Sequence, residues 1–190
     1  MTTSLVGSGF WTPKNWLTFI LPNNGTEPLN YLEIGVFCGH NVVLFEEIYA
    51  KHPDSKLYCV DPWDLLNTEY NENYDHATNY QHCLTNIDNT GRKEKFTVIK
   101  GFSHLEVPKF SDNFFDFVYI DGNHHPENVM EDAVVAFRKL KVNGFMIFDD
   151  YGWGGPDMVQ KGIDCFLTAY KTRVRWLGIS NMQVFCQRIS

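Results

Sequence analysis

The sequence predicts an α/β fold: a Rossmann-like, seven-stranded, mostly parallel sheet with helices on both faces. From residue 30 onward, apolar runs of strand length alternate with segments of helix length, which is typical of βα units. The last two apolar runs are separated only by Ser180-Asn181, so they should form a C-terminal antiparallel hairpin. The 190 residues suffice for one core. We expect a single domain over 29–190, preceded by an arm with a short helix over 1–28.

The first two strands each lead into a helix. Residues 29–36 (LNYLEIGV) predict the first strand, and 40–52 (HNVVLFEEIYAKH) predict its helix. The second strand should cover 55–61 (SKLYCVD). A long polar connection rich in Asn and Tyr then leads to a helix near 76–88.

Two further strands precede the next long helix. They are expected at 95–101 (KFTVIKG) and 114–121 (FFDFVYID). The helix should cover 126–140, because Pro126 is favourable in a first turn.

The last part of the chain should complete the sheet. Asn143-Gly144 is expected to separate the preceding helix from the fifth strand, 145–150 (FMIFDD). A helix over 156–171 follows, and the strands 174–180 and 182–189 should pair as the hairpin.

Composition argues against several functional classes. A formal charge of −7 and a pI near 5.4 disfavour nucleic acid, whose phosphates require clustered Lys and Arg. The N-terminus lacks a charged region followed by an apolar one, and no window has the length of a membrane span. The five cysteines are scattered without a C-x-x-C pair, which indicates reduced thiols rather than a zinc site or disulfides. We expect a cytoplasmic protein without membrane contact.

Ligands of open α/β sheets bind at the carboxyl ends of the strands. The first strand ends in an E-x-G-x-x-x-G turn containing Glu33, Gly35 and Gly39. Such a turn lets the backbone approach a ligand, although an ordinary βα turn explains the two glycines equally well. Asp61 ends the second strand, where a carboxylate can accept both hydroxyls of a ribose. Together these residues favour nucleoside binding.

Carboxylates also end the fourth and fifth strands, at Asp121 and at Asp149-Asp150. Carboxylates at neighbouring strand ends can converge on one hard cation, which would relieve their mutual repulsion. The alternative is that Asp121 caps the next helix and that one of the other two begins a turn. We favour the metal site.

His124 follows Asp121 in the loop before the helix, so its ring can reach the same edge of the sheet. Imidazole is a natural general base for a hydroxyl. For a histidine in a loop, a purely local role is the alternative. The neighbouring His125 should turn to solvent.

With these residues identified, the chain resembles the class I S-adenosylmethionine-dependent methyltransferases over most of 29–190. LEIGVFCGH resembles their first motif, CVDPWD the acidic end of their second strand, and GFMIFDDYGW their fifth-strand motif. Within that class it most resembles the small sugar and macrolide O-methyltransferase-like group, the methyltransferase domain 24 type. There, IDGxH precedes a helix and a pair of carboxylates.

The resemblance implies roles for individual residues. Glu33, Gly35 and Gly39 would face the methionine part of S-adenosylmethionine, and Asp61 would hold the ribose. Ser103 would lie near the adenine, although Phe102 replaces the acidic residue that is frequent before it. Mg²⁺ would bind the three carboxylates Asp121, Asp149 and Asp150, Asp121 would also border the cofactor, and His124 would be the base.

The implied reaction is metal-assisted methylation of a hydroxyl on a small acceptor such as a sugar or natural product. Substrate choice would fall to the arm and to residues 64–76 and 151–157, and the sequence leaves a homo-oligomer open. Two alternatives remain. A nucleotide-dependent oxidoreductase is opposed by the glycine spacing, and a non-catalytic cofactor-binding module has no need of Asp121, His124, Asp149 and Asp150 together.

Overall fold

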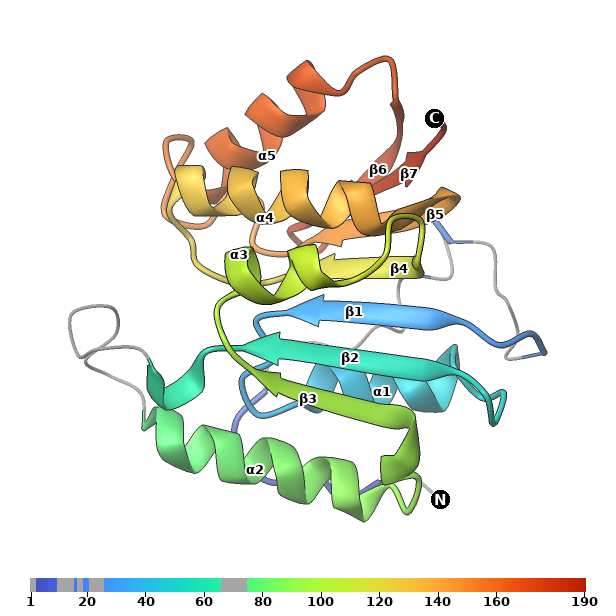
Figure 1. Ribbon diagram of the computed structural model, residues 1–190. Coiled ribbons are helices and arrows are strands. Elements are labelled where there is room, and N and C mark those ends of the chain that lie inside the picture. The colour runs from blue at the N-terminus through green and yellow to red at the C-terminus, as the bar shows by residue number, and fades with distance from the viewer. Residues whose placement is uncertain (1–2, 10–15, 17–18, 21–25, 66–74) are drawn as a thin grey trace.

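The computed structural model describes residues 3–9, 16, 19–20, 26–65 and 75–190, and it contains one sheet of seven strands (Figure 1). The strand order is β3-β2-β1-β4-β5-β7-β6. The strands are β1 (Asn30–Ile34), β2 (Lys56–Asp61), β3 (Phe96–Lys100), β4 (Phe115–Ile120), β5 (Leu140–Phe148), β6 (Val174–Ser180) and β7 (Gln183–Arg188). Strands β1 to β5 pair in parallel, and β7 is antiparallel to both β5 and β6. The predicted sheet and hairpin are confirmed.

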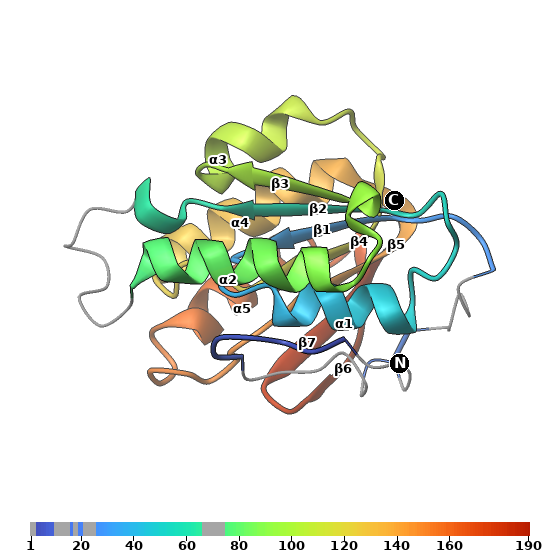
Figure 2. The same cartoon turned by 90° about the horizontal axis from the view of Figure 1, so that it is seen from below.

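Helices cover both faces of the sheet (Figures 1 and 2). The α-helices are α1 (His40–Ile48), α2 (His76–Asn89), α3 (Ser103–Glu106), α4 (Pro126–Lys139) and α5 (Val159–Ala169). Short 3-10 helices are η2 (Trp63–Leu65), η3 (Lys93–Lys95) and η4 (Val107–Lys109). Helices α1 and α2 lie on one face, and α3, α4 and α5 on the other. Among the described residues, no helix combines the length and apolarity needed to cross a bilayer.

Each face has its own apolar core. Phe137 and Phe166 pack with the sheet on the α4/α5 face, whereas Phe45 packs with the sheet on the α1 face. Trp16 belongs to the second core: it is fully buried, with its ring 5.2 Å from that of Tyr119 and 5.8 Å from that of Phe45. Trp16 of the arm thus packs against the sheet. The remainder of the expected arm helix falls largely outside the described residues.

The boundary between α4 and β5 differs from the prediction. Asn143-Gly144 does not separate a helix from a strand, because the helix ends at Lys139 and β5 begins at Leu140. Leu140 is in register with Phe115 and Phe145 with Phe117, so residues between them bulge out of the ladder. Asn143 adopts a left-handed conformation (φ 69°) within this bulge. The turn-forming residues thus act inside the strand.

The strand order places the polar residues of the predicted site on one edge. β1 lies between β2 and β4, and the order reverses there, which is where ligands bind in this class of sheet. Gly35 continues the ladder by donating to the Val60 carbonyl (3.0 Å), and the Asp121 amide donates to the Ile34 carbonyl (2.8 Å). The loops after β1, β2 and β4 are therefore tied together at the site.

Candidate functional site

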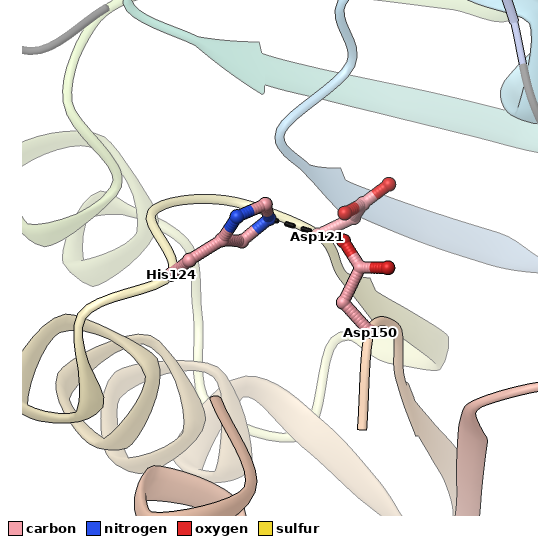
Figure 3. Close-up of side chains that lie close together, drawn as sticks. All are labelled: Asp121, His124 and Asp150. Carbon is pink, nitrogen blue, oxygen red and sulfur yellow. Dashed lines mark ion pairs between the residues drawn. The ribbon is translucent and has the colours of Figure 1, made fainter. Parts of the chain in front are cut away.

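Three side chains converge beyond the ends of β4 and β5 (Figure 3). Asp121 directly follows β4, His124 lies in the loop before α4, and Asp150 follows β5. One potential ligand atom of each lies within 4.8 Å of the others, and His124 Nε2 is 3.1 Å from Asp150 Oδ2. All three residues are partly buried. The arrangement can hold a cation or position an imidazole beside a bound hydroxyl.

Electrostatics at this cluster favour a positive partner. Burial, followed by the negative charges of Asp149 and Asp150, raises the pKa of Asp121 well above its usual range. A divalent cation would offset this repulsion, and two carboxylates with one imidazole form a donor set suited to such an ion. The residues present therefore fit a metal.

Asp149 does not belong to this group of potential ligands, although its charge contributes to the raised pKa of Asp121. Its carboxylate is buried, accepts a hydrogen bond from the Tyr119 hydroxyl, and also accepts one from the Asp150 amide (2.9 Å). Gln183 in turn donates to the Tyr119 oxygen (3.2 Å) and accepts from Trp16 Nε1 (2.8 Å). The structure thus brings His124, rather than Asp149, together with Asp121 and Asp150.

Asp61 holds the loop that follows β1. Its Oδ2 accepts from the amides of Val36 (2.7 Å) and Phe37 (2.9 Å), and its Oδ1 accepts from the amide of Trp63 (2.7 Å). A carboxylate offers about four acceptor positions, so Oδ1 keeps room for a ligand hydroxyl. Asp61 therefore shapes the loop as well as lying at the predicted ribose position.

The two predicted glycines occur where a side chain would not fit. A Cβ on Gly35 (φ 83°) would lie 1.8 Å from the Asp121 carbonyl oxygen. Gly39 (φ 77°) precedes α1, and a Cβ there would lie 3.0 Å from Cys83 Sγ. These positions allow the close approach that the turn was expected to require.

Glu33 is buried on the α1 face instead of opening onto the site. Its carboxylate accepts from the Tyr31 hydroxyl (2.6 Å) and from Asn41 Nδ2 (2.9 Å). Burial raises the pKa of Glu33 to about 8. Asn41 Oδ1 and Asn79 Nδ2, near the same loop, are buried without a hydrogen bond to the described residues. Such atoms are ones that a bound polar ligand satisfies, so this region fits a polar cofactor.

Ser103, the predicted adenine residue, begins α3 and is partly buried. Its hydroxyl donates to Oδ1 of Asp132 on α4 at 2.5 Å. Asp132 is buried, and this burial raises its pKa to about 7. A Cβ on Gly122 would lie 3.0 Å from the other carboxylate oxygen of Asp132.

Sequence reasoning missed two residues next to the predicted ones. Trp153 is 45% exposed and its ring lies 4.5 Å from the His124 ring. The sequence placed it in the segment 151–157 that was expected to choose the substrate, but gave no signal that singled out this tryptophan. The sequence did carry a signal for Asp132, because this residue falls among Val129, Ala133 and Ala136 on the buried stripe of α4. A carboxylate on the apolar face of a helix requires a partner.

Comparison with known proteins agrees with this geometry. A family model described as a methyltransferase domain matches residues 32–151, more than half of the chain. The uncharacterized protein R132 of Acanthamoeba polyphaga mimivirus is 25% identical over 135 residues, which is 66% of this chain. The chain spans about half (52%) of the length of that curated relative.

Solved structures share the whole fold. A Clostridium thermocellum protein described as an rRNA-methylase has a TM-score of 0.68 at 12% identity, over 93% of each chain. The O-methyltransferase TomG of Streptomyces achromogenes, solved with S-adenosylmethionine, has a TM-score of 0.68 at 14% identity, over 94% of this chain and 80% of that one. At these identities the likeness establishes the fold.

Proposed function

Because the chain belongs to the methyltransferase-domain family, we propose that it transfers the methyl group of S-adenosylmethionine to a hydroxyl of a small acceptor, assisted by a divalent cation. The observation that carries the proposal is the convergence of Asp121, His124 and Asp150 beside the loop after β1. TomG, a protein of the same fold, is an O-methyltransferase solved with this cofactor, which supports both the donor and the hydroxyl acceptor.

Each residue of the cluster has a role in this proposal. Asp121 and Asp150 would hold the cation, and Asp149 stabilises the turn that carries Asp150 by accepting from the Tyr119 hydroxyl and the Asp150 amide. When bound, S-adenosylmethionine supplies an electrophilic methyl group, and the cation lowers the pKa of the acceptor hydroxyl. His124 Nε2 lies 3.1 Å from Asp150 Oδ2. In the tautomer that carries its proton on Nε2, this nitrogen would donate to Asp150, and Nδ1 would accept the hydroxyl proton.

The surface beside the cluster indicates which acceptors fit. Trp153 and Met182 are 45% and 43% exposed, and the Tyr151 amide, two residues before Trp153, donates to the Met182 carbonyl (2.7 Å). An exposed indole next to the base is a stacking surface for a flat ring. We therefore favour an acceptor with a planar or apolar ring carrying the hydroxyl. Of the segments expected to choose the substrate, residues 66–74 and much of the arm lie outside the described part.

The test separates the base from the metal ligands. Mg²⁺ or Mn²⁺ and S-adenosylhomocysteine are titrated calorimetrically into the wild type and His124→Ala, and methyl transfer is measured on a panel of phenols and sugars. We expect His124→Ala to keep metal and cofactor affinity within about threefold while transfer falls by about 10² to 10⁴. Asp150→Asn should lose metal affinity.

His125→Ala is the matched control, because His125 is the exposed neighbour of His124. It should leave binding and transfer unchanged. A fall of about 10-fold or more in metal affinity for His124→Ala would make His124 a ligand instead of the base. Transfer that survives a chelator would remove the metal from the mechanism, and absence of cofactor binding by the wild type would overturn the proposed function itself.

A further inference from the structure

We propose that the buried pair Ser103–Asp132 makes the cofactor site selective for the 6-amino group of adenine, with Asp132 as the residue that fixes the direction of the Ser103 hydroxyl. The inference rests on the proposed function, because it concerns the base of the cofactor. The sequence analysis placed only Ser103, in the segment after β3, near the adenine; the inference adds Asp132 on α4.

The topology places this pair where the base must lie. Asp61 ends β2 at the expected ribose position, and β3 is the next strand outward from it. With the ribose held at Asp61, as the proposed function requires, a base that extends outward along the strand order would meet the segment that begins at Ser103. The hydrogen bond from Ser103 to Asp132 joins this segment to α4, which follows β4, although β2 and β1 lie between β3 and β4.

Asp132 is buried and closely packed at this edge of the sheet. It is 4% exposed, sits among the apolar residues of α4, and lies so close below Gly122 that a Cβ there would be 3.0 Å from its Oδ2. A carboxylate at such a position is costly unless it is paired. The Ser103 hydroxyl, 2.5 Å from Oδ1, is its partner.

The hydrogen bond determines what Ser103 can offer to a ligand. A serine hydroxyl has one proton and two lone pairs, whereas an ionised carboxylate only accepts. While Asp132 is ionised, the proton of Ser103 is committed to it, so the serine oxygen can only accept a hydrogen bond from the ligand. The 6-amino group of adenine donates one, but the 6-oxo group of hypoxanthine would place two acceptors face to face.

The experiment compares two ligands that differ at this group. S-adenosylhomocysteine and S-inosylhomocysteine are titrated calorimetrically at about pH 8.5, where Asp132 is ionised in the folded protein. The wild type should prefer the adenosyl ligand by about tenfold or more. In Asp132→Asn, the amide can donate to the serine oxygen and free the hydroxyl proton, so the preference should fall below about threefold.

Two further variants keep the test decisive. Glu131→Gln removes a carboxylate from the adjacent, exposed position of α4 and should retain the full preference. Ser103→Ala, at a partly exposed residue, should lose the preference even if Asp132→Asn does not fold. An unchanged ratio in folded Asp132→Asn or in Ser103→Ala would overturn the inference. Failure of the wild type to bind either ligand would instead contradict the proposed function.

Discussion

The carboxyl groups of this protein differ in pKa because their surroundings differ. Asp61 accepts from three backbone amides, which favours its ionised form even though burial raises its pKa. Glu33 has two side-chain donors, and burial outweighs them, so its pKa rises to about 8. The side chain of Glu33 therefore carries a proton at neutral pH, which makes it a neutral hydrogen-bonding group under the loop after β1.

This difference predicts a pH-dependent stability. An unfolded glutamate has a pKa near 4.3, so between about pH 4.5 and pH 8 the folded state binds more protons than the unfolded state. Glu33 should therefore favour folding most at low pH, and its contribution should be lost as the pH rises through about 8. Relative to Glu33→Gln, the wild type should lose on the order of 1.4 kcal/mol of unfolding free energy per pH unit in this window.

Urea unfolding of both proteins from pH 5 to pH 9 measures the difference. Glutamine keeps an oxygen that can accept from Tyr31, so the variant isolates the ionisation. Parallel profiles for the two proteins would contradict a raised pKa for Glu33.

At the scale of elements, a buried hydrogen-bond chain connects distant segments to the site. Trp16 from the arm, Gln183 from β7, Tyr119 from β4 and Asp149 after β5 are linked in that order. Trp16, Gln183, Tyr119 and Asp149 are all buried. This hydrogen-bond chain thus couples the position of the arm to the turn that carries Asp150.

Tyr119→Phe should break this chain while preserving the ring. It removes the donor to Asp149 and the acceptor for Gln183, and leaving buried polar groups unpaired costs about 1–3 kcal/mol of unfolding free energy. Tyr58→Phe is the control, because its ring packs near Phe110 and its hydroxyl has no hydrogen bond among the described residues. The control should change stability by less than about 0.5 kcal/mol. Equal effects of the two substitutions would show that the hydrogen-bond chain contributes nothing to the free energy of unfolding.

The elements also show what sequence patterns can predict. Apolar runs and their spacing predicted the strands, because each strand must be buried between two helical layers. The short connection expected at Ser180-Asn181 predicted the hairpin, whose turn in the structure is Asn181-Met182. The β5 bulge was missed because Asn143-Gly144 favours a turn in either context. Ser103–Asp132 was missed because it joins residues that are remote in sequence, and only their burial makes the bond necessary.

The sequence likewise predicted where the site residues lie, but not which of their side chains meet. Strand-end positions placed Asp121, Asp149 and Asp150 on one edge, since parallel neighbours end together. The direction of each side chain depended on partners from other elements: Tyr119 draws Asp149 inward, and His124 pairs with Asp150. The sequence pattern thus predicted where these residues lie, and packing determined where their side chains point.

One property of the whole chain, its net charge, bears on the class of acceptor. Its formal charge is −7, and its candidate site is built around carboxylates. A protein of the same fold is described as an rRNA-methylase, yet RNA binding depends on releasing counterions from phosphates neutralised by Lys and Arg. The charge therefore favours small acceptors over RNA.

We therefore expect the protein not to bind RNA, even at low ionic strength, where such binding is strongest. Anisotropy of a fluorescent RNA hairpin, titrated with protein and S-adenosylhomocysteine at about 20 mM salt, should stay flat up to micromolar protein. The same titration with Mg²⁺ present tests whether a cation at Asp121 and Asp150 creates a phosphate site. Affinity that weakens steeply as salt is added would identify true phosphate contacts, and the acceptor would then have to be sought among nucleic acids.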